Sequence, residues 1–253
     1  MLLKDIIDII ESVAPLSTQA EWDNSGLQIG HNDADIASVL CCTDVTEAVV
    51  DEAIQKHCEL ILSHHPLLFH GLKTIQGLTF QERVAEKAIR HGISIYSSHT
   101  PMDVYLHGVS GHMAQQLGVV DYQPLTEEGY GVIGTLPKPL TPDELLAEVK
   151  DKFHTSAIRY TQPVKKAVSR IAFGGGACAE FLDTAVVQQA DAFVSSDFKH
   201  HEFLQAEGRI MILDIGHFES EQFIKDIYRE LLQDTPVQLT YATTDKSPVS
   251  AYV

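Results

Sequence analysis

The sequence predicts an α/β fold, because apolar strand-like runs and amphipathic helical segments alternate along most of its 253 residues. Three apolar runs in the first half are typical of strands in a largely parallel sheet that is covered on both faces: 37–45, 58–65 and 93–99. Helices are expected around them, where apolar residues recur with helical spacing: 3–15, 46–57 and 80–92.

A turn-rich, acidic stretch near 120–130 suggests a domain boundary, after which the alternation resumes. Thr141, with Glu144 three residues later, forms the pattern of a capping box and predicts a helix start. Further strands are expected at 157–162, 168–176, 192–197, 209–217 and 237–243, with helices at 177–190 and 218–234. We therefore expect two α/β domains with mostly parallel or mixed sheets flanked by helices, divided as 1–125, 126–208 and a C-terminal strand–helix–strand at 209–253.

Composition excludes several classes of function. The formal net charge of −17 argues against a broad nucleic-acid surface and against docking on anionic membranes. The four cysteines form no CxxC pair, which favours reduced, buried thiols over a zinc or redox motif. The N-terminal segment carries acids, unlike a signal peptide, and no apolar run is long enough for a membrane span. We expect a cytoplasmic protein.

Polar side chains follow three of the predicted strands, where ligands bind in open α/β sheets. They are His64 and His65, then His99 and Asp103, then His217 and Glu221. The last two are spaced i, i+4 and share one helical face. Imidazole and carboxylate ligands suit Zn, Fe or Mn, and five of these residues, all but His99, predict a site for two divalent ions with Glu221 as the bridge. His99 is expected to support the ligands or to carry protons.

His64 and His65 are neighbours on a chain that Pro66 biases toward an extended conformation. Side chains of adjacent extended residues diverge, so we expect each histidine to bind a different ion. Simpler interpretations stay open: a solvated histidine pair, an exposed His217–Glu221 pair, and a turn-forming Asp103.

Three other segments have candidate structural or functional roles. Asp197 and His201, within "SSDFKHH", are expected to line the same cleft or a subunit contact, or Asp197 caps a helix. The glycines at 174–176 suggest either a phosphate cradle or, preferably, a tight strand-to-helix turn. The segment "WDNSGLQIG" (22–30) predicts a turn of unassigned role.

Taken together, "WDNSGLQIG", "SHHPLLFHG", "SSHTPMD", "SSDFKHH" and "DIGHFESE" resemble the Nif-three-like dinuclear metal centre proteins, also called GTP cyclohydrolase I type 2 homologues, in their short bacterial form. The resemblance extends over essentially the whole chain. It implies a two-domain α/β subunit, a toroidal homohexamer with metal pairs facing its interior, and the same five metal ligands. The family's Thr-Gly-Asp segment reads Ser195-Ser196-Asp197 here, so its glycine is replaced.

The favoured interpretation is a dinuclear metal-dependent hydrolase that acts on a nucleotide or related small molecule, with His99 and Glu221 in catalytic roles. The two divalent ions would be Zn, Fe or Mn. No guanine-reading motif is recognisable in the sequence. The alternative is a non-enzymatic hexameric ring protein that binds metal or handles it for partners.

Overall fold

The computed structural model describes residues 1–251, which form two compact units. The first unit combines Met1–Met102 with Ile224–Lys246, and the second combines Asp103–Phe223 with the segment that begins at Ser247. The predicted division into 1–125, 126–208 and 209–253 follows the order of the sequence. The two observed units instead group the segments that pack together. That three-part division stays a prediction.

The first unit is built on a five-stranded sheet with the order β1-β4-β3-β2-β11. Its strands are β1 (Gly26–Ile29), β2 (Ser38–Cys42), β3 (Leu60–Ser63), β4 (Ser94–Ser97) and β11 (Gln238–Tyr241). All neighbours are parallel except β1, which runs antiparallel to β4 at the edge. The carboxyl ends of β2, β3 and β4 therefore lie next to one another along one edge of the sheet.

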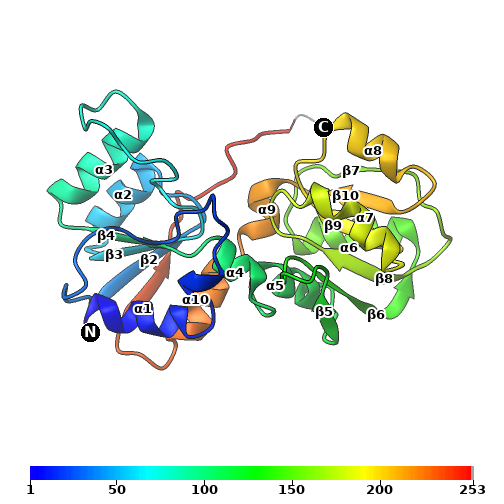
Figure 1. Cartoon of the computed structure of the whole chain (residues 1–253), viewed down its shortest axis with the longest axis horizontal. Coiled ribbons are helices and arrows are strands. Elements are labelled where there is room, and N and C mark those ends of the chain that lie inside the picture. The colour runs from blue at the N-terminus through cyan, green and yellow to red at the C-terminus, as the bar shows by residue number, and fades with distance from the viewer. Residues whose placement is uncertain (252–253) are drawn as a thin grey trace. The chain divides into compact units, whose positions relative to one another are not determined.

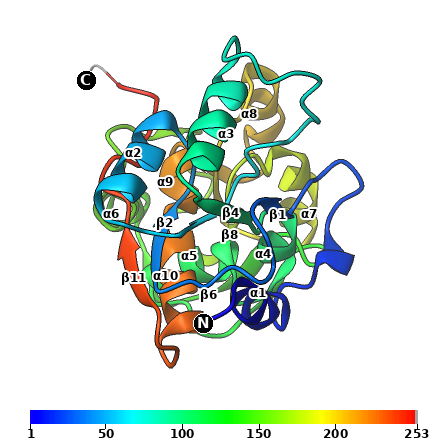
Figure 2. The same ribbon diagram turned by 90° about the vertical axis from the view of Figure 1, so that its left-hand side faces the viewer.

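Four helices cover the two faces of this sheet, as Figures 1 and 2 show. They are α1 (Leu3–Glu11), α2 (Glu47–Gln55), α3 (Phe80–Arg90) and α10 (Ile224–Leu232), with a short 3-10 turn at Leu16–Thr18. Helices α2 and α3 pack together on one face, and α1 packs with α10 on the other. Alternate residues along the strands, such as Leu40 and Cys42, face α2 and α3 in one apolar core.

The second unit has a six-stranded mixed sheet with the order β5-β6-β8-β9-β10-β7. Its strands are β5 (Tyr122–Pro124), β6 (Val132–Leu140), β7 (Arg159–Tyr160), β8 (Val168–Phe173), β9 (Ala192–Ser195) and β10 (Met211–Asp214). The central pairs β8–β9 and β9–β10 are parallel, and the outer pairs are antiparallel. As in the first unit, parallel strands deliver their carboxyl ends to one edge.

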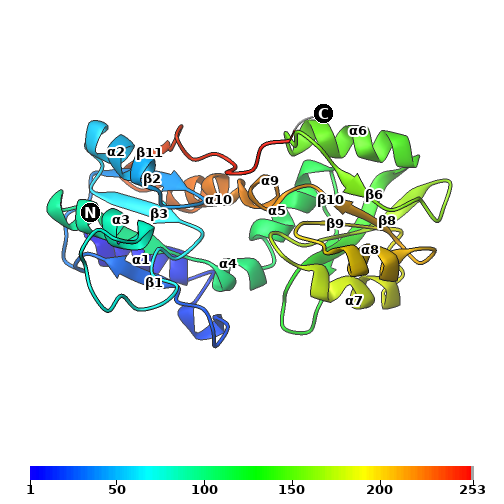
Figure 3. The same ribbon diagram turned by 90° about the horizontal axis from the view of Figure 1, so that it is seen from above.

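Helices also cover both faces of this second sheet. They are α5 (Val109–Gln116), α6 (Pro142–Lys152), α7 (Leu182–Val187) and α8 (His200–Ala206), with a 3-10 turn at Ala179–Phe181 before α7. Figure 3 shows α6 on one face and α7 with α8 on the other. The alternation is regular: on β10, Met211 and Leu213 join the core under α5 and α6, and Ile212 joins the core under α7 and α8. Two short helices complete the chain, α4 (Thr100–Val104) and α9 (His217–Glu221).

The predicted fold class is confirmed: both units are α/β, with one largely parallel and one mixed sheet flanked by helices. The capping box of α6 forms as expected from Thr141 and Glu144. The single helix expected over 218–234 is wrong, because α9 and α10 are separate helices on either side of a turn at Gln222 and Phe223. Among the helices of residues 1–251, none combines the length and apolar character that a membrane crossing requires.

One buried carboxylate ties the end of β11 to α2 within the first unit. Glu52 accepts hydrogen bonds from the backbone N–H groups of Thr243 and Thr244 and from both their hydroxyls, over 2.7–3.0 Å. Burial alone would raise the pKa of Glu52, but hydrogen bonds from Lys56, Thr243 and Thr244 lower it far below its ordinary value of 4.5.

We predict that Glu52→Gln lowers the free energy of unfolding by about 1–3 kcal/mol at neutral pH. A carboxylate whose pKa is lowered by folding stabilises the protein above its unfolded pKa, and this contribution is lost as the pH falls toward the folded value. The difference between wild type and variant should therefore shrink steadily below the ordinary pKa of 4.5. Urea unfolding at a series of pH values measures it.

Glu86→Gln is the control, because Glu86 forms only an exposed i, i+4 pair with Arg90 on α3. It should change stability little at any pH. A Glu52→Gln effect that is equally large in neutral and acidic buffer would contradict the assigned role of the charge.

Candidate metal centre

The carboxyl end of β3 delivers two histidines whose rings are held from behind. His64 is fully buried, and its Nδ1 lies 3.1 Å from the carbonyl oxygen of Ser98. His65 has its Nδ1 2.9 Å from Oδ1 of Asp44, two residues after the end of β2. A carbonyl or carboxylate oxygen only accepts, so Nδ1 donates in both rings and Nε2 is the nitrogen that can bind a cation.

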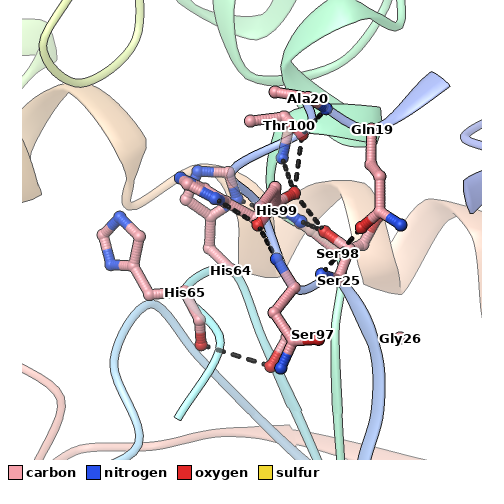
Figure 4. A network of polar contacts seen from close by, with 12 residues as sticks. Gln19, Ala20, Ser25, Gly26, His64, His65, Ser97, Ser98, His99 and Thr100 are labelled. Atoms are coloured by element: carbon pink, nitrogen blue, oxygen red, sulfur yellow. Dashed lines mark hydrogen bonds and ion pairs between the residues drawn. The ribbon is translucent and has the colours of Figure 1, made fainter. Parts of the chain in front are cut away.

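His99, two residues after β4, is oriented in the same way by Asp23 of the "WDNSGLQIG" segment. Its Nδ1 lies 3.0 Å from Oδ1 of Asp23, whose side chain is 0% exposed. Oδ2 of Asp23 accepts from the Ser25 hydroxyl and from the backbone N–H and hydroxyl of Thr100. Burial alone would raise the pKa of Asp23, but the hydrogen bonds from His99, Thr100 and Ser25 hold it well below its usual range. Figure 4 shows His99 within this network.

The three imidazoles of this cluster lie together. The ring centroids of His64, His65 and His99 are 4.9–5.3 Å apart, and each residue offers a ligand atom within 4.8 Å of the others. Nitrogen ligands of a tetrahedral ion with bonds near 2.1 Å are about 3.4 Å apart, so side-chain adjustments of about an ångström suffice. Both the donor type and the spacing fit a divalent ion.

The expected divergence of His64 and His65 is wrong. β3 ends at Ser63, and both histidines lie in a bend, where the alternation of an extended strand no longer applies. Whether each histidine serves a different ion stays a prediction. The structure adds His99 as a third potential ligand beside them, a role beyond the outer-group and proton-transfer roles predicted from sequence.

The second unit carries the pair predicted on α9. Nε2 of His217 lies 3.1 Å from Oε2 of Glu221, one helical turn away. On the other side of the ring, Nδ1 of His217 lies 2.7 Å from Oδ2 of Asp197, two residues after β9. Asp197 therefore orients His217 as Asp23 orients His99. The predicted partner of Asp197 in a shared cleft, His201, lies exposed on α8 against the ring of His200.

Asp103, on α4, lies close to the buried thiol of Cys178, as does Glu221. Burial raises the pKa of Cys178 well above its ordinary value, and the negative charges of Asp103 and Glu221 raise it further. Cys178 is free and buried, as expected for the cysteines of this chain.

Comparisons with known proteins identify the family. The family model for Duf34/NIF3 (NGG1p interacting factor 3) matches residues 1–248. The chain belongs to this family. A relative from Clostridium perfringens, named GTP cyclohydrolase 1 type 2 homolog, is 34% identical over 228 residues, which cover 87% of each chain.

Solved structures agree with this assignment. The Staphylococcus aureus hypothetical protein SA1388 has 25% sequence identity and a TM-score of 0.92, covering 100% of this chain and 99% of that one. A Bacillus cereus protein related to NIF3 has the same fold, with a TM-score of 0.89, 22% identity, and coverage of 100% and 99%. The resemblance inferred from the five sequence segments is confirmed.

In this Duf34/NIF3 member, the glycine turn after β8 makes room for the Glu221 carboxylate. Gly176 has a φ of +66°, and a Cβ placed there would lie 2.1 Å from Oε1 of Glu221. The turn is fixed on both sides: the Gly176 N–H donates to the Ser220 hydroxyl, and its carbonyl accepts from the hydroxyls of Ser195 and Ser196. The tight-turn interpretation is confirmed, and the turn packs against the Glu221 carboxylate.

Sequence reasoning missed three features around the candidate ligands: the orienting carboxylates Asp23 and Asp44, and the contact between Gly176 and Glu221. Asp44 offered a signal, because it follows a predicted strand as the ligands do. Asp23 precedes its strand and gave none.

We predict that Gly176→Ala lowers the metal content of the purified protein, because the new methyl group displaces the Glu221 carboxylate. Gly208→Ala is a matched control: its φ is +71°, but no atom lies within 4 Å of the added Cβ. Both variants should lose about 1–2 kcal/mol of stability from backbone strain. Metal analysis after identical reconstitution should separate them, and equal metal content in the two variants would contradict the role of the turn.

We further predict that Asp23→Asn weakens divalent-metal binding about 10- to 100-fold, because the ring of His99 loses its charged acceptor. Calorimetric titration with Zn²⁺ measures the change, and thermal unfolding verifies that the variant is folded. Asp51→Asn is the control, since the exposed Asp51 carboxylate on α2 pairs with Lys87 on α3. A folded Asp23→Asn protein that binds metal as tightly as wild type would refute a ligand role for His99.

Proposed function

We propose that this chain is a dinuclear divalent-metal protein that hydrolyses a nucleotide or a related small molecule. One observation carries the proposal: four histidines at strand ends, His64, His65, His99 and His217, each have Nδ1 bonded to an oxygen acceptor. Surface histidines have no need of this repeated arrangement, whereas metal-binding histidines do. The relatives named GTP cyclohydrolase 1 type 2 homolog support a nucleotide as the substrate class.

His64, His65, Asp103, His217 and Glu221 would hold the ions, with His99 as a proton-transfer group or an additional ligand. Bound divalent ions would polarise a substrate oxygen and activate water. The chain's own contribution is orientation: Asp23, Asp44 and Asp197 fix three of the rings, and the Gly176 turn fixes the position of Glu221.

Five carboxylates are assigned to the centre as ligands or as orienting groups, and they are Asp23, Asp44, Asp103, Asp197 and Glu221. Two divalent ions would bring four positive charges, close to these five negative ones. Water screens part of this charge, because the side chains of Asp44 and Asp197 are 44% and 54% exposed. The ligand types suit Zn, Fe and Mn alike, so availability decides among them.

The toroidal homohexamer implied by the family resemblance is part of the proposal, with the metal pairs facing its interior. Light scattering should give six times the 27.9 kDa mass of one chain. The competing function, a non-enzymatic metal-binding ring that serves partners, shares this assembly and differs only in its lack of turnover.

The decisive experiment is an activity screen on reconstituted protein with measured metal content, over nucleoside triphosphates, modified nucleotides and simple phosphoesters. We expect about two ions per chain and hydrolysis of at least one nucleotide. Glu221→Gln should lower both metal content and turnover, the latter at least about 100-fold, while the oligomeric mass stays unchanged.

Glu86→Gln serves again as the control, since it removes an exposed helical carboxylate outside the centre. Full metal loading without turnover of any substrate would instead support the metal-handling ring. One ion or fewer per chain after careful reconstitution would overturn the dinuclear proposal itself.

A further inference from the structure

A pair of exposed aromatic rings lies beside the histidine cluster of the first unit. Trp22 is 60% exposed and Phe69 is 36% exposed, although large aromatic side chains are usually buried for most of their area. We propose that this pair is a stacking platform that binds a planar heteroaromatic ring of the ligand next to His99. The proposal rests on the proposed function for the choice of substrate and names its chemical class.

The geometry of the three rings defines one open surface. Trp22 and Phe69 are nearly parallel, with an interplanar angle of 15° and ring centroids 5.8 Å apart. Both meet the ring of His99 at a steep angle, 70° and 69°, with centroid separations of 5.6 Å. A ring inserted between Trp22 and Phe69 needs two van der Waals gaps of about 3.5 Å each, more than their separation allows. The ligand ring therefore stacks on the exposed face of Trp22.

The platform is held in place before any ligand arrives. Next to Trp22, the Asp23 carboxylate makes the buried hydrogen bonds described above, and Asn24 donates to the Leu68 carbonyl at 2.6 Å. The Leu68 N–H in turn donates to the Gln28 side chain at 3.2 Å. The segment that carries Trp22 is thus tied to the one that carries Phe69. A fixed aromatic face loses little conformational entropy on binding.

Size and position favour a small planar ligand over a protein partner. A stable protein interface buries more than about 1,000 Å² in total, and two neighbouring rings offer far less. Aromatic stacking is worth most for a flat ring, and the adjacent histidines suit an anionic or oxygen-rich group on the same molecule. A nucleotide combines both parts: its base would stack on Trp22 and its phosphate would face the histidine cluster.

The chain contains a single tryptophan, so fluorescence excited at wavelengths that tryptophan absorbs and its eight tyrosines do not reports on this platform. We expect GMP to quench the fluorescence of metal-loaded protein in a saturable way, with free N-acetyltryptophanamide as the control for light absorption by the base. Ribose 5-phosphate carries the same phosphorylated sugar without the ring. It should cause little quenching and bind at least about 5-fold more weakly in calorimetry.

Variants test which side chains are responsible. In calorimetric titrations with GMP, Trp22→Ala and Phe69→Ala should weaken binding about 5- to 150-fold, and Trp22→Phe should retain most of the affinity. Phe80→Ala is the matched control, because Phe80 is 41% exposed at the start of α3 and has no place in the platform. Thermal unfolding of each variant verifies that it is folded.

The proposal is overturned if ribose 5-phosphate binds as tightly as GMP, if GMP does not bind, or if Trp22→Ala and Phe80→Ala bind GMP equally well. These outcomes are distinct from a failure of the proposed hydrolysis. GMP binding that depends on Trp22 without turnover of any nucleotide removes the hydrolase and leaves the platform. Turnover that persists unchanged in Trp22→Ala retains the hydrolase and removes the platform.

Discussion

The hydrogen bond from Nδ1 to an oxygen acceptor is the constraint on which the candidate centre depends. A neutral imidazole offers one nitrogen as a donor and the other as an acceptor, and only the latter binds a cation. In this chain, backbone carbonyl and carboxylate oxygens around each ring determine that Nδ1 is the donor. The strands must therefore end where both a histidine and its acceptor can meet. Parallel neighbours β2, β3 and β4 satisfy this condition by placing Asp44, His64, His65 and His99 at one edge.

The carboxylate acceptors differ in burial, and a more buried acceptor orients its histidine ring more rigidly. The side chain of Asp23 is 0% exposed, whereas those of Asp44 and Asp197 are 44% and 54% exposed. A charge–dipole contact is stronger where water is excluded, so His99 is the most rigidly oriented of the three histidines that have carboxylate partners. The "WDNSGLQIG" segment, which looked like a simple turn, supplies that buried acceptor and also carries the exposed Trp22. One segment therefore links the histidine cluster to the aromatic surface.

Most of the fold was readable from the sequence because apolar periodicity is a local signal. The apolar runs that form β2, β3 and β4 are continuous and bounded by turns, and the capping box predicted the start of α6.

Strand β6 was not predicted, because Pro137 and Pro139 look like strand breakers. Its pairing with β8 is indeed irregular between Thr135 and Leu140. The break between α9 and α10 could not be predicted, because the amphipathic pattern of a helix continues across it. Only tertiary packing separates Phe223, in the core of the second unit, from the helix that belongs to the first.

The candidate ligands were predictable because their residue types and their positions at strand ends both point to metal, whereas their supports were not. Asp23 lies 76 residues from His99, and no spacing rule connects them. The segment Ser195-Ser196-Asp197 is another such support. Ser196 uses its hydroxyl to bind the Gly176 carbonyl, and the left-handed backbone conformation falls on Asp197, with a φ of 58°. Aspartate tolerates that conformation better than most residues, and here its carboxylate is turned toward His217. The backbone conformation at Asp197 therefore serves the same constraint as the other orienting carboxylates, because it accompanies the contact that holds the His217 ring.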